Sequence, residues 1–472
     1  MKSFPDGFRW GVSTSAYQIE GAVDDDGRGR SIWDTFSHAP GTIEGDGTGD
    51  VACDHYHRWR DDLDLMRDLG VDTYRFSIAW PRIHPSGNAE VEQRGVDHYN
   101  RLIDGLLERG IEPLVTLYHW DLPQTLEDAG GWLARDTAHR FAEYAATCFD
   151  AYGDRVRSWI TVNEPWIVGL LGYRLGLHAP GFQDVRKEVT AFHHLLLAHG
   201  LAMRELRSSA HDGRAGVAFA LSPHYPFSDD PADVAAARES DGYVNRFFLD
   251  AVLEGSYPAD TLELFERVAG PLDFIRDRDL ETIGTPSDLI GVNYYARRIV
   301  RSAPGRRPYP WDVVVEGGAP TTEGGTAGVP MTEAGTEITP DAFTDLLVRL
   351  RDDYGNRPIV ITENGASYGD EPGPDGRVRD TRRLDYIRSH LGAVHAAIEQ
   401  GVAVEGYCYW SLLDNFEWAL GYGQRFGITY VDYQSQKRVP KDSFDWYKKV
   451  IASNGHSLLQ KGLLPVAQVT PG

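Results

Sequence analysis

The sequence has little cysteine, no long apolar run and a deficit of positive charge. Cysteine occurs only at Cys53, Cys148 and Cys408, and an odd count at wide spacings argues against a disulfide framework or a zinc site. No apolar run approaches the roughly 18 residues that a transmembrane helix requires. The formal net charge of −23 disfavours a nucleic acid or an anionic membrane surface as partner, because both require a basic face.

The N-terminal segment also lacks the pattern of a secretory signal. Residues 1–21, MKSFPDGFRWGVSTSAYQIEG, contain no basic stretch followed by an apolar one. Together with the few, dispersed cysteines, this favours a reducing cytoplasm as the location. The negative surface is typical of a protein that stays in solution, and the oligomeric state is left open.

The chain does contain enough apolar and aromatic residues for a large core. Of its 472 residues, 42% are hydrophobic and 11% aromatic, including 12 Trp and 23 Tyr. The aromatic surplus fits a cleft that holds a polar ligand against rings, although a large core would also absorb many of them. The length exceeds that of most single domains, but an α/β barrel often reaches it as one unit.

Eight short segments rich in Val, Ile, Thr and aromatic residues recur along the chain. Several are near-continuous apolar runs, which are typical of parallel strands buried on both faces. The segments are FRWGVSTSA (8–16), TYRFSIAW (73–80), EPLVTLYHW (112–120), SWITVNEP (158–165), AGVAFALS (215–222), LIGVNYYA (289–296), PIVITENG (358–365) and VEGYCYWSLLD (404–414).

Helical patterns separate these segments. We predict helices over 57–70, 96–110, 136–153, 343–355 and 382–401, with Asp136 as the N-cap of the third and glycine at several ends. Eight strand-then-helix units predict an α/β fold, a single closed (β/α)₈ TIM barrel with long βα-loop insertions. In such a barrel the active residues lie at the carboxyl ends of the strands.

The predicted barrel occupies most of the chain. We expect one catalytic domain over residues 1–455 and an irregular tail over 456–472. Residues 297–340 are rich in Gly, Pro and Thr, and they are predicted to form a long loop between the sixth and seventh strands.

Two of the predicted strands end in a glutamate beside an asparagine. Glu164 lies in TVNEP (161–165) and Glu363 in ITENG (361–365), so the fourth and seventh strands would direct both carboxyl groups into one mouth. Such a pair suits cleavage of a glycosidic bond, in which one group protonates the leaving oxygen and the other attacks the anomeric carbon or activates water. Two unrelated surface carboxylates are the alternative, but joint placement at strand ends favours a catalytic pair.

Further motifs follow in a fixed order along the chain. FRWGVSTSAYQIEGA, YRFSIAWPRI, LYHWDLPQ, TVNEPW, GVNYY, ITENG and LLDNFEWALGY span some four hundred residues. With them the sequence resembles glycoside hydrolase family 1, the β-glucosidase family, over nearly its whole length. The resemblance implies a retaining exo-β-glycosidase without a cofactor. It favours a β-glucosidase that acts on small oligosaccharides or β-glucosides, with β-fucosides and β-galactosides as further candidates.

The resemblance also assigns roles to individual residues. Glu164 would be the general acid/base and Glu363 the nucleophile, about 5 Å apart in the retaining scheme. Arg75 and Tyr295 would support Glu363 as a carboxylate through a positive charge and a hydrogen bond. The negative charge on Glu363 would in turn raise the pKa of Glu164 and keep it protonated.

A sugar pocket must bind hydroxyl groups and stack against a sugar face. Trp410 resembles the platform beneath the ring, Asn163 would hold the 2-hydroxyl, and Glu417 would make charge-assisted hydrogen bonds. By contrast, we assign Trp59 and Trp159 to the core. The positions that match the family's sugar-binding residues are Gln18, His119, Trp120, Asn163, Asn293, Trp410, Glu417, Trp418 and Phe426.

The leaving-group side shows one departure from the family pattern. Trp166 and Val168 would border it, but in MTEAGTEITP (331–340) Thr336 occupies a position where the family has tryptophan. A wider or more polar entrance is expected, and the aglycone preference stays open. Glu417 stands where a phospho-glycosidase carries phosphate-binding residues, and its charge would repel a 6-phosphate.

Three other functions remain as alternatives. Another retaining barrel glycosidase could cleave within polysaccharides, a sugar-binding protein could lack turnover, and a barrel hydrolase could depend on a metal. No metal site is predicted, because the H-x-H of His55 and His57 opens a helix. His193, His194 and His199 lie in one helical run, AFHHLLLAHG. We expect these histidines to pack or to form hydrogen bonds.

Overall fold

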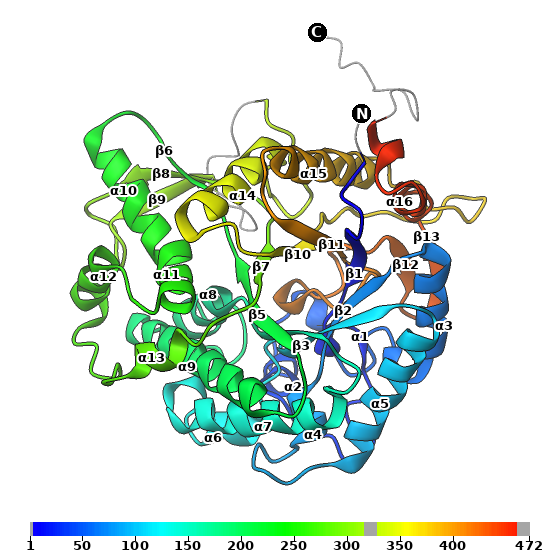
Figure 1. The fold of residues 1–472 in the computed structure, drawn as a ribbon, viewed down its shortest axis with the longest axis horizontal. Coiled ribbons are helices and arrows are strands. Elements are labelled where there is room, and N and C mark those ends of the chain that lie inside the picture. The colour runs from blue at the N-terminus through cyan, green and yellow to red at the C-terminus, as the bar shows by residue number, and fades with distance from the viewer. Residues whose placement is uncertain (1–2, 316–327, 460–472) are drawn as a thin grey trace.

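The protein, seen in a computed structural model that describes residues 3–315 and 328–459, is built around a ring of parallel strands (Figure 1). The ring strands are β1 (Arg9–Ser13), β2 (Thr73–Ser77), β3 (Glu112–Tyr118), β4 (Ser158–Asn163), β5 (Arg214–Ala220), β7 (Ile290–Asn293), β10 (Ile359–Asn364) and β11 (Val404–Trp410). They close in the order β1-β11-β10-β7-β5-β4-β3-β2, and every pairing is parallel. The predicted (β/α)₈ barrel is confirmed.

The barrel strands are buried on both faces, which explains their near-continuous apolar sequences. All residues of β2, β4 and β10 are buried. The barrel interior contains a compact cluster that fills the ring rather than leaving a pore. The cluster comprises Leu114, Ile160, Ala218, Leu289, Val360 and Cys408.

Helices surround the barrel and cover its outer face (Figure 1). Five of them correspond to the predicted helices: α3 (His55–Leu69), α5 (Gln93–Glu108), α7 (Asp136–Tyr152), α14 (Pro340–Tyr354) and α15 (Thr381–Glu399). The other α-helices are α1 (Ala16–Ile19), α2 (Ile32–Ser37), α4 (Trp80–Ile83), α6 (Gln124–Asp128), α8 (Pro165–Ile167), α9 (Val185–Ser208), α10 (Pro231–Asp241), α11 (Phe247–Glu254), α12 (Ala259–Ala269), α13 (Asp279–Ile283) and α16 (Asp442–Ala452). Short 3₁₀ or π turns are η1 (Glu44–Asp46), η2 (Gly131–Leu133), η3 (Val168–Arg174), η4 (Gly242–Arg246), η5 (Trp418–Leu420) and η6 (His456–Leu459).

The prediction that Asp136 caps α7 is wrong. Arg135 is the capping residue, with helical backbone angles and no side-chain cap, and Asp136 is the first helical residue. The carboxylate of Asp136 instead accepts a hydrogen bond of 3.2 Å from Nε of Arg140, one turn later. An acidic first turn still favours the helix, because it faces the positive end of the helix dipole.

The prediction of a plain loop over residues 297–340 is also wrong in part. The insertion contains β8 (Arg298–Ser302) and β9 (Trp311–Val315), which form a three-stranded sheet with β6 (His224–Pro226). Two short β-branched runs pair across a proline-rich turn, and the Gly/Pro/Thr composition of the whole stretch concealed them. Residues 316–327 of the insertion lie outside the described residues. A separate two-stranded sheet joins β12 (Thr429–Asp432) to β13 (Lys437–Pro440).

The predicted tail begins as helix η6, and residues 460–472 lie outside the described part of the chain. In the two described ranges, no helix combines the length and apolar character needed to cross a membrane.

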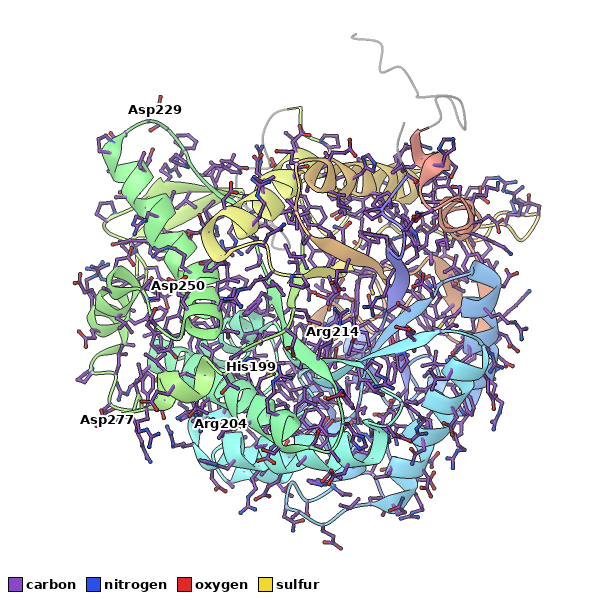
Figure 2. All side chains as sticks on the ribbon, in the orientation of Figure 1. His199, Arg204, Arg214, Asp229, Asp250 and Asp277 are labelled. Carbon is purple, nitrogen blue, oxygen red and sulfur yellow. The ribbon has the colours of Figure 1, made fainter. Side chains whose placement is uncertain are left out.

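Side chains fill the space between the barrel and its helices (Figure 2). His199, labelled on α9, is completely buried, and its Nδ1 lies 2.7 Å from Oγ1 of Thr161 on β4. His193 lies 2.8 Å from both the Tyr257 hydroxyl and Oδ2 of Asp279, and Nδ1 of His194 lies 2.9 Å from a backbone carbonyl oxygen. The prediction that these histidines pack and form hydrogen bonds is confirmed.

Candidate active site

The predicted site residues lie at the carboxyl ends of the barrel strands. Glu164 directly follows β4, His119 directly follows β3, and Asn293 and Trp410 are the last residues of β7 and β11. Glu363 is the penultimate residue of β10 and pairs in register with Asn293. Because all eight strands run in the same direction, these side chains share one rim of the barrel.

Glu363 has a partner at each carboxyl oxygen. Nη1 of Arg75 donates to Oε1 over 2.5 Å, and the Tyr295 hydroxyl donates to Oε2 over 2.9 Å. The Arg75 side chain is fully buried and that of Glu363 is 5% exposed. A buried guanidinium and a phenol hydroxyl therefore both stabilise a carboxylate at this position.

Glu164 lies in a different electrostatic environment. Its only hydrogen-bonded side-chain partner among the described residues is Asn293, whose Nδ2 donates to Oε1 over 2.7 Å. Burial and the negative charge of Glu363 raise the pKa of Glu164 to about 8. The carboxyl group is therefore protonated at neutral pH and can act as an acid.

A hydrogen-bond network joins the two glutamates. Oδ1 of Asn163 accepts from Nη2 of Arg75 over 2.6 Å and from Nδ2 of Asn293 over 3.1 Å. Arg75 also holds Glu363, and Asn293 also holds Glu164. The positions of the two carboxyl groups are thus fixed by one set of buried side chains.

His119 presents an unused donor beside this network. Nδ2 of Asn163 donates to its Nε2 over 3.1 Å, so the ring proton of the neutral tautomer is on Nδ1. Burial, with a smaller contribution from Arg75, keeps the pKa of His119 well below its usual range. Nδ1 is buried and has no hydrogen-bond partner in the described structure, which leaves one donor of this ring unsatisfied.

Gln18 and Glu417 form a second polar pair on the rim. Nε2 of Gln18 donates to Oε2 of Glu417 over 3.2 Å and to Oδ1 of Asn415 over 3.0 Å. Burial and the charge of Glu363 raise the pKa of Glu417 to about 8. An amide and a carboxyl group held side by side can bind two neighbouring hydroxyl groups.

The predicted sugar-binding rings also gather here. Trp418 packs against Trp120 with ring centroids 4.6 Å apart, and His119 lies 5.9 Å from both Trp410 and Trp418. Phe426 lies farther round the rim, 6.3 Å edge-on from Tyr295. The structure therefore brings the predicted polar and aromatic residues to one end of the barrel.

Comparison with known proteins agrees with this arrangement. The family model described as glycosyl hydrolase family 1 matches residues 1–456. The chain belongs to this family. It is 46% identical to β-glucosidase A of Acetivibrio thermocellus over 453 residues, which cover 96% of this chain and 99% of the relative. It is 48% identical to a bifunctional β-D-glucosidase/β-D-fucosidase of Bifidobacterium breve over 462 residues, or 96% and 98% of the two chains.

A solved structure also matches this family 1 chain. The β-glucosidase of Thermotoga maritima in complex with glucoimidazole has a TM-score of 0.90 and 45% identity, and the match covers 96% of this chain and 100% of that one. The fold and its sequence motifs therefore agree over nearly the whole length.

Three site residues of the family 1 chain have left-handed backbone angles without being glycine. The φ angles are +83° at Trp120, +49° at Glu164 and +51° at Trp418. Such conformations cost energy and persist only where the surroundings impose them, which is common at binding and catalytic sites. The backbone N–H of Glu164 is held by the Ala218 carbonyl oxygen over 2.8 Å.

Two threonines that were not predicted from the sequence orient side chains of this site. Oγ1 of Thr362 donates to Oδ1 of Asn293 over 2.6 Å, which directs Nδ2 of that amide towards Glu164. Oγ1 of Thr116 accepts from Nε of Arg75 over 3.2 Å. Both lie on inward-facing strand positions, but only the strand register shows which side chain each one meets.

The residues predicted for the leaving-group side lie in two segments. Trp166 follows Glu164 closely, and its ring lies 4.7 Å from the Arg298 guanidinium and 6.0 Å edge-on from Tyr243. Val168 begins η3 and is buried. Thr336 is also buried, in a turn closed by its backbone N–H and the Thr332 hydroxyl over 3.2 Å. The predicted wider or more polar entrance stays a prediction.

The core assignments of Trp59 and Trp159 are confirmed, because the two residues are 7% and 0% exposed. In the described ranges, no group of three or more His, Cys, Asp or Glu side chains could hold a metal ion.

Proposed function

We propose that the protein is a retaining exo-β-glycosidase that prefers β-glucosides, with Glu363 as nucleophile and Glu164 as general acid/base. One observation carries this proposal. Two buried carboxyl groups share a network, yet Arg75 and Tyr295 stabilise Glu363 as a carboxylate while the pKa of Glu164 is raised to about 8. Opposite protonation states in one carboxyl pair are what double displacement requires.

In the first step, an oxygen of Glu363 attacks the anomeric carbon. The bond from that carbon to the leaving oxygen breaks, and Glu164 transfers its proton to this oxygen. The product is a glycosyl ester on Glu363 with Glu164 as a carboxylate. Asn163 holds the 2-hydroxyl, where hydrogen bonds strengthen in the oxocarbenium-like transition state.

In the second step, Glu164 accepts a proton from water. Esterification has removed the negative charge of Glu363, which was one cause of the raised pKa of Glu164. Glu164 is therefore a stable carboxylate and can act as base. The water oxygen bonds to the anomeric carbon, the ester bond breaks, and Glu363 is released as a carboxylate.

The remaining pocket residues recognise the sugar. Gln18 and Glu417 bind adjacent hydroxyl groups, His119 donates through Nδ1, and Trp410 supports the ring. The preference for glucosides rests on the relatives, which are named β-glucosidases, one of them also a β-D-fucosidase. Glu417 disfavours 6-phospho sugars, because a carboxyl group provides no positive charge to bind a phosphate.

A panel of nitrophenyl glycosides together with cello-oligosaccharides of increasing length tests this proposal. We expect the β-glucoside to be the best monosaccharide substrate, followed by the β-fucoside. Cello-oligosaccharides should lose glucose from one end. Faster cleavage inside a long glucan would instead indicate an endo-acting enzyme, and no turnover of any aryl β-glycoside would indicate a sugar-binding protein. Unchanged rates in a chelator would exclude a metal-dependent hydrolase.

Two wider proposals accompany the function. We infer one catalytic domain over residues 1–455, which the family match to residues 1–456 supports. We also infer a cytoplasmic location from the three cysteines, all of them free and buried.

A further inference from the structure

A small internal cavity lies beside the sugar pocket, and the proposed mechanism does not use it. It has a volume of about 10 Å³, close to the minimum that accommodates one water molecule. Most of its wall comes from α1, α4 and the segments around them. Its lining residues are Ala16, Tyr17, Glu20, Gly21, Val23, Arg28, Gly49, Ala79, Arg82 and Asp121.

Two polar groups of this cavity lack hydrogen-bond partners in the described structure. Asp121 is 1% exposed, and neither carboxyl oxygen has a hydrogen-bond partner in another described residue. Arg82 is also 1% exposed; its Nε donates to Glu20 over 2.6 Å and its Nη2 to the Gly21 carbonyl oxygen over 2.7 Å, but Nη1 has no partner. Unsatisfied buried polar groups are costly, and a water molecule commonly satisfies them.

Most charged groups around Asp121 form ion pairs with one another. Nη1 of Arg28 donates to Asp34 over 2.8 Å, and Arg82 donates to Glu20. Burial outweighs the nearby Arg28 and raises the pKa of Asp121 to about 8. At neutral pH the Asp121 carboxyl is therefore uncharged, and it can both donate and accept a hydrogen bond.

The lining of the cavity is next in sequence to two groups of predicted sugar-binding residues. On one side, Asp121 directly follows His119 and Trp120, whose left-handed φ of +83° must be imposed by its surroundings. On the other side, Tyr17 lines the cavity next to Gln18 in α1, and its ring stacks on Trp418 at a centroid distance of 6.1 Å and an angle of 9°. A change in the cavity would therefore reach sugar-binding residues on both sides.

We propose that one internal water molecule bridges the Asp121 carboxyl and Nη1 of Arg82, and that Asp121 acts through it as a positioning residue for His119 and Trp120. This inference rests on one part of the proposed function, namely that His119 and Trp120 bind the sugar. Asp121 itself does not touch the substrate. Its bridge holds the turn after β3 against α4 and so keeps the strained Trp120 and the donor of His119 in place.

Variants of Asp121 in the full chain, assayed with nitrophenyl β-glucoside, test this role. Asp121→Asn matches the shape of the protonated acid and should stay within about threefold of the wild type in KM. Asp121→Ser shortens the side chain and breaks the bridge. It should raise KM about tenfold with kcat within about threefold, because the sugar contacts of His119 and Trp120 exist in both the bound substrate and the transition state.

Asp72 offers a matched control. Its carboxyl group lies just before β2, at the opposite end of the barrel, and accepts a hydrogen bond from the Trp10 backbone over 3.0 Å. Asp72→Ser should leave KM unchanged. If Asp121→Ser shares the wild-type KM, or if both serine variants raise KM equally, the positioning role is refuted.

A double-mutant cycle with His119→Ala separates positioning from a general loss of stability. If Asp121 acts through His119, the double variant should bind glucose at least about threefold more tightly than the two single losses predict together. Additive losses would overturn the proposal.

A crystal structure at about 1.5 Å resolution should show density between Asp121 and Arg82, and an empty cavity would refute the bridge. Glucose binding and density do not require turnover, so they remain informative if the proposed function fails.

Discussion

Replacing Glu363 with alanine should lower kcat for aryl β-glucosides by about five orders of magnitude, because no other group can attack the anomeric carbon. The neighbouring carboxyl groups cannot substitute for it. Glu164 is held by a hydrogen bond from Asn293 and Glu417 by one from Gln18, so each stays at its own place on the rim.

The fold of the Glu363→Ala variant should survive, but its thermal unfolding temperature should fall. Arg75 is fully buried and would lose its charged partner, which costs about 3–5 kcal/mol in comparable buried pairs. Glu363→Gln keeps the shape and a hydrogen-bond acceptor, so it should be comparably inactive and less destabilised. Circular dichroism with steady-state kinetics checks both, and near-native turnover by either variant would refute the nucleophile assignment.

Replacing Glu164 with alanine should produce a loss that depends on the leaving group. Substrates with poor leaving groups, such as cellobiose, need protonation of the departing oxygen and should slow by about 10³-fold. For dinitrophenyl glucoside, the formation of the glycosyl ester should change by less than about tenfold, because this leaving group departs as an anion. Pre-steady-state kinetics measures that step, and equal losses across leaving groups would contradict the acid role.

The pH dependence of kcat/KM provides a second test of Glu164. The pKa of this acid is raised to about 8, so its reactive protonated form dominates below pH 8 and is lost above it. The wild type should therefore lose activity above about pH 8, and Glu164→Ala should lack that decline. The pKa of Glu417 is also raised to about 8, so a decline of equal size that persists in Glu164→Ala would show that Glu417, not Glu164, limits activity above pH 8.

The barrel could be predicted because its strands have a local signal. Segments such as TYRFSIAW and PIVITENG are buried on both faces, so their sequences are apolar and β-branched without alternation. Once eight such strands were assigned, the rule that parallel strands share one rim placed Glu164 and Glu363 together. The same local reasoning missed β8 and β9, because the Gly/Pro/Thr composition of the insertion concealed two short runs that pair with each other and with the distant β6.

The detailed site could not be predicted, because it depends on contacts between residues far apart in the chain. Thr362 on β10 orients Asn293 on the neighbouring strand β7. The unsatisfied hydrogen-bonding groups of Asp121 and Arg82 can be recognised only in the folded structure, where α4 meets the turn after β3. The failed cap at Asp136 has a local origin instead: Arg135 already has helical backbone angles, so Asp136 lies inside the helix. Arg140, one turn into the helix, competes with the helix end for that carboxylate.

The configuration of the first product tests the central claim most directly. Proton NMR during the first minutes of hydrolysis of an aryl β-glucoside distinguishes α- from β-glucose before mutarotation mixes them. Two displacements at one carbon, first by Glu363 and then by water, should release β-glucose first. Initial release of α-glucose would mean that water attacks directly, and it would contradict the roles assigned to both glutamates.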